Sequence, residues 1–196
     1  MADADTTQVP SDPGDDPVTA AALAVIEAEV PGAVVASQLD GPHPWIQVGV
    51  DHLRGACRAL KEHADTQLDC CHLISGVDWP DANDGAGEME AVYHLVSYRK
   101  PVEDAYRTRP VKNDPFVALK VRVPRDKPEV PTVMDIWTGA DWHERETWDL
   151  CGIRFTGRQS LHRILLPEDW PGHPLRKDWV FPASYHGVPI IPPEGM

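Results

Sequence analysis

The residues that come nearest to a catalytic pattern are His143 and Glu144. In zinc hydrolases the sequence H-E-x-x-H places two histidines on one helix face, with the glutamate as general base. Here the fifth position is Thr147, so the second histidine ligand is missing. A free-standing zinc hydrolase would have to use His143, Glu144 and His173, and it is kept only as an alternative.

Cofactor motifs are absent from the sequence. It contains no G-x-x-x-x-G-K-[ST], and the glycines at 85 and 87 lack the third glycine of a dinucleotide fingerprint. An iron–sulfur cluster generally needs four converging thiolates. Cys70 and Cys71 fall in a predicted strand, where neighbours face opposite sides, and Cys57 falls on the apolar face of a predicted helix. We therefore expect no cofactor and no metal on this chain, and ordinary reduced cysteines in a cytoplasmic setting.

A third group of residues combines tryptophan with matched charges. From Glu144 to Trp179 there are six acidic and six basic residues, interleaved with further tryptophans. Trp and Arg mixed with carboxylates are typical of protein–protein contacts. The alternative is a solvated helix on which Arg145 and Asp149 pair at i, i+4, worth about 0.3–0.5 kcal/mol.

The elements that must position these residues are predicted to form an α+β fold. It has a mixed or antiparallel sheet with flanking helices, followed by an extended proline-rich C-terminal arm. Apolar spacing and turn residues predict helices at 18–30, 52–63 and 142–151, and strands at 33–37, 45–50, 68–77, 91–99, 116–123 and 162–166. Asp51 is expected to cap the second helix, an Asp141–Glu144 capping box to begin the third, and Gly152 to end it.

Composition divides the chain into three parts. Residues 1–17 are expected to be a disordered acidic tail, 18–130 an α/β domain, and 131–196 the third helix, a short strand and a partner-wrapping arm. The net charge of −13 over 196 residues argues against nucleic-acid binding, and no apolar run is long enough to span a membrane. Residues 99–127 are locally basic, which indicates either a charged sheet edge or a contact with an acidic protein partner.

Two blocks of the sequence resemble a known family. They are ADWHERETWDLCGIRF at 140–155 and GHPLRKDW at 172–179, linked by Leu161 and the run RIL at 163–165. Both are similar to the motifs of the 30-kDa-type peripheral-arm subunit (the C subunit) of the proton-pumping NADH-quinone oxidoreductase, respiratory complex I. The resemblance covers most of residues 20–180 and is most specific over 131–179.

The resemblance implies a subunit that binds no cofactor and has no catalytic residues of its own. The complex carries electrons from NADH through FMN and iron–sulfur centres to quinone, coupled to proton translocation. In the family, this subunit packs beside the quinone-site (D) subunit and neighbouring iron–sulfur subunits and wraps its partner with the C-terminal segment. That places it peripherally on the cytoplasmic face of the inner membrane. By motif match, the structural and partner-contact residues would be Trp142, Glu144, Arg145, Glu146, Asp149, Arg163, His173, Arg176, Lys177 and Asp178.

One position departs from the family. Gly-His-Pro is common after the first block in the family, whereas here Gly157 is followed by Arg158 and Gln159. Any contact that the family's histidine makes at this turn is therefore expected to be missing. The same motifs occur in related membrane-bound hydrogenases and ferredoxin-fed complexes, so the equivalent subunit of such a complex stays an alternative.

Overall fold

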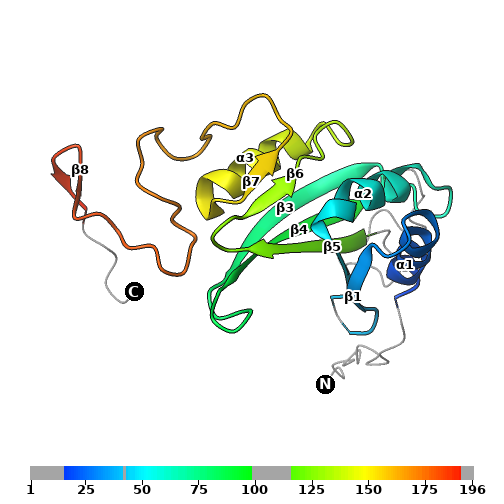
Figure 1. The fold of residues 1–196 in the computed structure, drawn as a ribbon. Coiled ribbons are helices and arrows are strands. Elements are labelled where there is room, and N and C mark those ends of the chain that lie inside the picture. The colour runs from blue at the N-terminus through cyan, green and yellow to red at the C-terminus, as the bar shows by residue number, and fades with distance from the viewer. Residues whose placement is uncertain (1–15, 42, 99–115, 191–196) are drawn as a thin grey trace, which may run out of the picture.

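The computed structural model describes residues 16–41, 43–98 and 116–190. The elements (Figure 1) are, in chain order, helix α1 (Pro17–Glu29), strands β1 (Val34–Gln38) and β2 (Trp45–Val48), the 3-10 helix η1 (Val50–His52), helix α2 (Leu53–Glu62), strands β3 (Cys70–Trp79), β4 (Glu88–Val96), β5 (Phe116–Pro124) and β6 (Glu129–Pro131), helix α3 (Ala140–Cys151), and strands β7 (Arg154–Thr156), β8 (Ser184–Tyr185) and β9 (Val188–Pro189).

Five of the strands form one mixed sheet in the order β1-β2-β5-β4-β3. The β2–β5 pair is parallel and the other pairs are antiparallel. β6 and β7 form a separate two-stranded parallel sheet, and β8 and β9 form a hairpin. The predicted α+β class, with a mixed sheet and flanking helices, is therefore confirmed, although the strands at 129–131 and 154–156 were not predicted.

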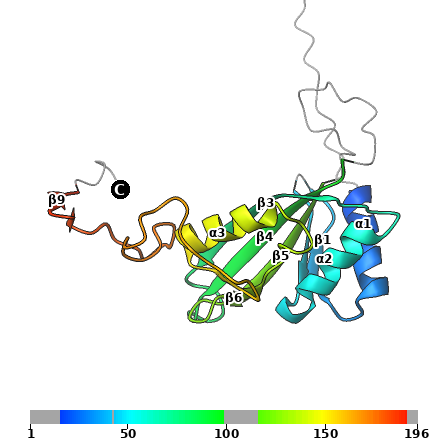
Figure 2. The ribbon, with the colours of Figure 1, turned by 90° about the horizontal axis from the view of Figure 1, so that it is seen from above.

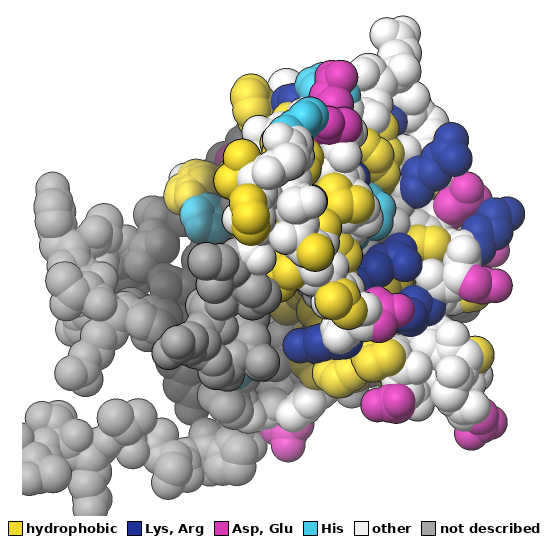
Figure 3. Space-filling view, turned by 90° about the vertical axis from the view of Figure 1, so that its left-hand side faces the viewer, with side chains coloured by type: hydrophobic (Ala, Val, Ile, Leu, Met, Phe, Trp, Pro, Cys, Tyr) yellow, Lys and Arg dark blue, Asp and Glu magenta, His cyan; other side chains and the backbone are white. Residues whose placement is uncertain are grey.

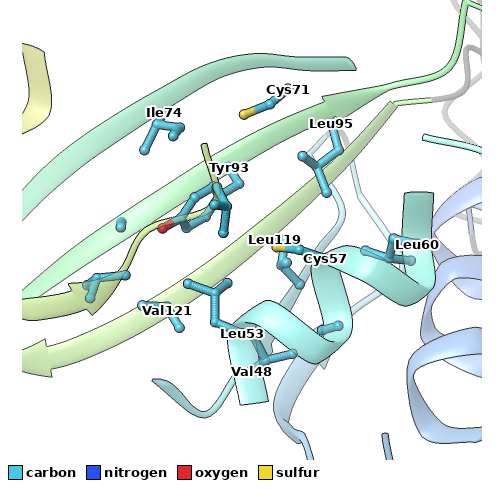
Figure 4. Packing of buried hydrophobic residues seen from close by; sticks show 14 of the residues in the cluster. Val48, Leu53, Cys57, Leu60, Cys71, Ile74, Tyr93, Leu95, Leu119 and Val121 are labelled. Atoms are coloured by element: carbon cyan, nitrogen blue, oxygen red, sulfur yellow. The ribbon is translucent and has the colours of Figure 1, made fainter. Parts of the chain in front are cut away.

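The apolar core lies on one face of the large sheet. Every second residue of β4 is buried there and is paired with a buried residue of β5. The paired rows are Met89 with Val123, Ala91 with Val121, Tyr93 with Leu119, and Leu95 with Val117. Figure 4 shows side chains from this face pointing toward α2. This alternation is the period of two that a half-buried strand requires.

Helix α2 covers the core with a stripe of side chains at helical spacing. The predicted apolar face is confirmed, because Leu53, Ala56, Cys57 and Leu60 are all fully buried. The predicted cap at Asp51 is wrong: that residue belongs to η1, and the helix begins after His52 without a side-chain cap. The tight 3-10 turn orders the start of the helix in place of a cap.

Helix α1 begins one residue inside the stretch expected to be a tail. Asp16 accepts a hydrogen bond from the Thr19 backbone N–H (2.7 Å), and Pro17 occupies the first helical position, where its missing N–H costs nothing. The rest of the expected acidic tail, residues 1–15, lies outside the described residues. So does most of the basic stretch at 99–127, of which the structure describes 116–127.

Helix α3 packs directly on β3, and a glycine makes this close approach possible. A Cβ atom on Gly76 would lie 2.8 Å from Cys151 Sγ and 3.0 Å from Thr147 Cγ2. The Thr147 hydroxyl donates to the Ile74 carbonyl (2.9 Å) at the same contact. Residues on both sides of position 130 belong to one apolar cluster, so α3 and β7 complete the core that begins with α1.

The chain after β7 departs from its predicted structure. The strand predicted at 162–166 is wrong: these residues form turns, because three of their backbone N–H groups bind a side chain rather than a neighbouring strand. Within 157–190 the only regular elements are β8 and β9. Figures 1 and 2 show this segment crossing the end of α3 and leaving the body formed by the elements from α1 to β7, which we call the sheet domain. The β8–β9 hairpin lies farthest from it.

Replacing Gly76 with alanine should test the α3–β3 contact. We expect Gly76→Ala to lower the free energy of unfolding by about 1–3 kcal/mol, because the added methyl group overpacks the Cys151 contact. Gly55→Ala, at an exposed position of α2, is the matched control. Its Cβ would meet Val30 only at 3.4 Å, so it should stabilise the protein by about 0.4–1 kcal/mol. Urea denaturation measures both, and equal effects of the two variants would refute close packing at Gly76.

Candidate functional site

The candidate site is built on four charged residues of α3, which are Asp141, Glu144, Arg145 and Asp149. Two segments from outside the helix surround them, 131–135 before it and 157–178 after it. The helix begins after Gly139 without a side-chain cap. The predicted capping box at Asp141 and Glu144 is therefore wrong, because both carboxylates bind other groups.

Glu144 is fully buried at the centre of the first group. Its carboxylate accepts hydrogen bonds from the Thr132 hydroxyl (2.6 Å), the Val133 backbone N–H (2.7 Å) and Arg158 Nη1 (3.0 Å). Burial raises the pKa of Glu144 above its ordinary value, although the hydrogen bonds and the Arg158 charge oppose that rise. This carboxylate holds the loop before α3 and the loop after β7 against the helix.

Arg158 follows Gly157, where the resemblance led us to expect His, and it fills a structural role. Its guanidinium is almost entirely buried and binds Asp141 and Glu144 together, while Nε donates to the Ser160 carbonyl (2.7 Å). Gly157 precedes it with a φ of 83°, which glycine adopts at little cost. The departure from the family motif therefore supplies a positive charge to two neighbouring carboxylates.

Arg145 is buried and completes this group next to an exposed tryptophan. It donates to Asp141 Oδ2 (2.8 Å) and lies 3.1 Å from His162 Nε2, with its guanidinium over the exposed Trp142 ring (4.3 Å). The proposed i, i+4 pair between Arg145 and Asp149 is wrong. Arg145 instead pairs one turn back along the helix, and Asp149 binds a different arginine.

Asp149 is also fully buried and organises the second group. Oδ1 accepts from Arg163 Nη1 (2.7 Å), and Oδ2 accepts from the backbone N–H groups of residues 164, 165 and 166 (3.0, 2.8 and 3.0 Å). Burial acts to raise the pKa of Asp149, but these donors together hold it below its ordinary value. Because one oxygen binds three successive N–H groups, the chain has to curve around it.

The segment 173–176 caps the C-terminal end of α3. His173 Nδ1 lies 2.9 Å from the Asp149 carbonyl, the Leu175 N–H donates to the Leu150 carbonyl (2.9 Å), and Arg176 Nε donates to the Cys151 carbonyl (2.9 Å). These carbonyls have no partner within the helix, and the negative end of the helix dipole favours cationic side chains. Gly152 ends the helix at a φ of 78°, as predicted. A Cβ there would lie 2.5 Å from the His173 ring.

A third buried carboxylate, Asp78, was not among the predicted site residues. Arg125 binds it through Nε (2.7 Å) and Nη2 (2.9 Å), and the Lys177 backbone N–H donates to it (2.8 Å). Arg125 also binds the exposed Asp178 (2.6 Å). Hydrogen bonding to Arg125 holds the pKa of Asp78 below its ordinary value. The one sequence signal that could have revealed this pair was an Asp at the end of a largely apolar run, because a charged side chain there needs a partner if it is buried.

The ten predicted site residues differ in how far they are exposed to solvent. Glu144, Arg145 and Asp149 are buried and bound within the chain, and Arg163, His173 and Arg176 are half-buried against the same helix. Trp142, Lys177 and Asp178 are exposed, and Glu146 is half-buried. Besides Asp78 and Arg125, the prediction missed Thr132 and Arg158 as contacts of the buried acids.

The zinc alternative does not fit this geometry. The carboxylate of Glu144 faces Thr132, Val133 and Arg158, while His173 binds the far end of α3. Within the described residues, no three or more His, Cys, Asp or Glu side chains are grouped so that they could hold a metal ion.

An open depression of about 850 Å³ lies beside the N-terminal half of α3. Its wall includes Arg54, Met134, Asp135, Arg158 and His162. Arg54 binds both oxygens of Asp135 (2.7 Å each), and Arg158 is bound by two acids. The wall charges are already paired, so the depression is poorly suited to an anionic ligand.

Removing the Asp149 carboxylate should be costly. Asp149→Ala leaves Arg163 and three backbone N–H groups without their acceptor. We therefore expect the free energy of unfolding to fall by about 3–5 kcal/mol. Glu146→Ala is the control, because Glu146 lies on the same helix and takes part in none of the ion pairs found among the described residues. A loss below 1 kcal/mol in urea denaturation of Asp149→Ala would contradict the assignment.

The raised pKa of Glu144 predicts a pH dependence of defined sign. A carboxyl group whose folded pKa exceeds its unfolded value takes up its proton first in the folded state, so it adds stability as the pH falls through that window. As the pH falls, the free energy of unfolding of the wild-type chain should rise relative to that of Glu144→Gln, by about 1.4 kcal/mol for each unit by which the folded pKa exceeds 4.5.

Urea denaturation of both proteins at several pH values from 7 to 4.5 measures this change. If the variant instead becomes the more stable of the two as the pH falls, burial of this carboxyl group is refuted.

Residues 46–185 match the family model of the respiratory-chain NADH dehydrogenase 30-kDa subunit. The C subunit of the NADH-quinone oxidoreductase of Acidothermus cellulolyticus is 34% identical over 88% of this chain and 83% of its own. Those of Mycolicibacterium gilvum and Saccharopolyspora erythraea are 37% and 36% identical, over 76% and 88% of this chain. The chain spans less than two thirds of these last two relatives, 61% and 65% of their lengths.

Two solved structures share the fold. One is from the membrane-bound sulfane sulfur reductase, an archaeal respiratory membrane complex, with a TM-score of 0.61, 27% identity and coverage of 82% and 85% of the two chains. The other is the trypsin-resistant fragment (1–134) of Nqo5, with a TM-score of 0.54, 26% identity and coverage of 72% and 99%. None of the helices in the described residues is both long and apolar enough to cross a bilayer. The resemblance of the two sequence blocks is confirmed, and the chain belongs to the family of the 30-kDa subunit of respiratory-chain NADH dehydrogenase.

Proposed function

We propose that this chain is a non-catalytic, cofactor-free subunit in the peripheral arm of a proton-pumping NADH-quinone oxidoreductase. Its task is to support assembly of the quinone-site region, while electrons pass from NADH through FMN and iron–sulfur centres of other subunits to quinone. Its partners are the quinone-site (D) subunit and the neighbouring iron–sulfur subunits. It is held at the cytoplasmic face of the inner membrane through the complex.

The observation that carries this proposal is the division of charge along the C-terminal segment. Acidic residues of the two motifs are bound by arginines of the same chain, which we call the anchor. Arg158 binds Asp141 and Glu144, Arg163 binds Asp149, and Arg125 binds Asp178. The twelve residues 179–190 that follow contain no Asp, Glu, Lys or Arg. Val180 and Val188 are 81% and 66% exposed there. Figure 3 shows hydrophobic side chains exposed on this side of the molecule. An uncharged, exposed segment held by a charged anchor is suited to burial against another protein.

The cysteines support the view that this chain carries no electrons. Burial raises the pKa of the Cys71 thiol to about 12 and that of Cys151 to about 11, and it also raises the pKa of Cys57. Cluster ligands and catalytic nucleophiles act as thiolates, which these surroundings disfavour. These three thiols therefore fit a packing role.

A second candidate is the corresponding subunit of a related membrane complex that uses a different donor or acceptor, such as a membrane-bound hydrogenase or a ferredoxin-fed complex. The likeness to a chain of the archaeal sulfane sulfur reductase complex favours keeping it. The anchor and the uncharged segment suit either assembly equally well. The genes beside this one, and the proteins that purify with it, separate the two.

Co-purification tests the proposal directly. A tagged chain expressed in its host and extracted in mild detergent should bring down the quinone-site subunit, iron–sulfur subunits and NADH:quinone activity. Replacing Val180 and Val188 together with aspartate should reduce this recovery at least about tenfold, because two charges would then be buried at the contact. The variant chain should stay folded, since both side chains are exposed.

Val35→Asp provides the matched control, because Val35 is 63% exposed on β1 in the sheet domain. It should leave recovery unchanged. A wild-type chain that is recovered alone after mild extraction would contradict the proposed function. Recovery of hydrogenase or ferredoxin-linked subunits would favour the second candidate instead.

A further inference from the structure

Asp78 joins three separate parts of the chain at the edge of the sheet domain. Its side chain is almost completely buried near the end of β3, and its two oxygens bind Nε and Nη2 of Arg125, which follows β5. Oδ2 also accepts the backbone N–H of Lys177 (2.8 Å), which comes 99 residues later in the chain. A carboxylate buried in this way has to keep such donors to stay charged.

Arg125 extends the same contact outward to the C-terminal segment. Its Nη2 donates to Asp178 Oδ1 (2.6 Å) as well as to Asp78 (2.9 Å). The side chain lies close to the backbone at Gly87, where a Cβ atom would be 2.7 Å from Arg125 Cδ. Gly87 also has a φ of 76°. Glycine at position 87 therefore leaves the space through which Arg125 reaches both acids.

Asp178 is the last residue of the segment that binds the sheet domain. Residues 175–178 each contact it in turn, through the Leu175 N–H, the Arg176 side chain, the Lys177 N–H and the Asp178 carboxylate. Each hydrogen bond, ion pair and ring contact found for the described residues 179–190 joins them to residues within 169–190. The Asp78–Arg125–Asp178 cluster is thus the point at which the segment departs.

The segment beyond this point makes contacts within itself that give it a shape of its own. Trp179 packs between Trp170 (6.3 Å) and Phe181 (4.6 Å), and Trp170 packs on Tyr185 (5.0 Å). His186, with a φ of 49°, and a following glycine form the two-residue turn of the β8–β9 hairpin. If such a segment also leaves the domain in a fixed direction, it loses less conformational entropy when it binds a partner.

We propose that Arg125 is a positioning residue, which fixes the direction in which residues 179–190 leave the sheet domain and so presents them to another subunit of the complex. The docking part of this inference rests on the proposed function, whereas the positioning part concerns this chain alone. The partner surface that it implies is an uncharged protein groove, matched to a segment without Asp, Glu, Lys or Arg.

Hydrogen exchange on the isolated full-length chain tests the positioning part. The Lys177 amide should exchange at least about tenfold faster in Arg125→Met, because Asp78 loses its main partner and its hold on the segment weakens. Asp178→Ala breaks only the exposed contact, so it should speed exchange about two- to fivefold. Asp178→Glu, which keeps the carboxylate, should restore the wild-type rate.

Arg122→Met is the matched control, because Arg122 lies on β5, the strand that Arg125 follows. It binds a buried carboxylate, Glu90 (2.6 Å), that has no described contact with the C-terminal segment. It should leave Lys177 exchange within about twofold of wild type. Unchanged exchange in both Arg125→Met and Asp178→Ala overturns the inference, as does an equal increase in Arg122→Met.

Recovery of the other subunits tests the docking part with the same variants. Arg125→Met and Asp178→Ala should lower co-purification while Arg122→Met and Asp178→Glu do not. Faster Lys177 exchange together with full co-purification would overturn the claim that direction matters, and would leave the proposed function standing. Failure of the wild-type chain to co-purify would instead refute the proposed function, and the exchange data would still decide whether Arg125 holds the segment.

Discussion

A carboxylate that is removed from water has to find donors for its lone pairs, and at Asp149 this requirement determines the path of the chain. One oxygen accepts the N–H groups of residues 164, 165 and 166, and the other accepts Arg163. No extended strand could bring three successive N–H groups to one atom, so the segment turns. Once it has turned, His173 and Arg176 lie beside the last carbonyls of α3 and supply the donors that these carbonyls lack.

The same requirement recurs at two further buried acids, Glu144 and Asp78, and each is met by an arginine. Glu144 is bound by Arg158 and Asp78 by Arg125, each from a segment later in the chain. Each pair joins α3 or β3 to a loop, 157–160 or 125–128, that contributes no residue to the apolar core cluster. The paired charges of this anchor all precede residue 179, and residues 179–190 contain no Asp, Glu, Lys or Arg. This division between a charged anchor and an uncharged end supports a subunit that binds a partner.

Parts of this structure could be read from local sequence. The alternation in β4 and β5, the apolar stripe of α2 and the glycine after α3 each depend on residues a few positions apart. The predicted capping box was wrong because Arg145 and Arg158 bind the two oxygens of Asp141, and Arg158 is 17 residues away in the sequence. The strand at 162–166 failed because an apolar run does not reveal that a distant carboxylate will bind its backbone.

The family motifs pointed to charged residues without their binding partners. Glu144, Asp149 and Arg163 were predicted to contact another subunit, and the structure places all three in ion pairs within this chain. Asp78 and Arg125 were missed because 47 residues separate them and neither carries a recognisable spacing. Pairings of this kind become visible only when the tertiary structure brings the two ends together.

The central claim is that the motif charges are bound within this chain before any partner is present. Amide hydrogen exchange of residues 164–166 in the isolated wild-type chain tests it most directly, since their shared acceptor is the Asp149 carboxylate. We predict that these three amides are protected and lose that protection together. Exchange at the rate of an unstructured peptide would contradict it, and would mean that the motif is ordered only by its partner.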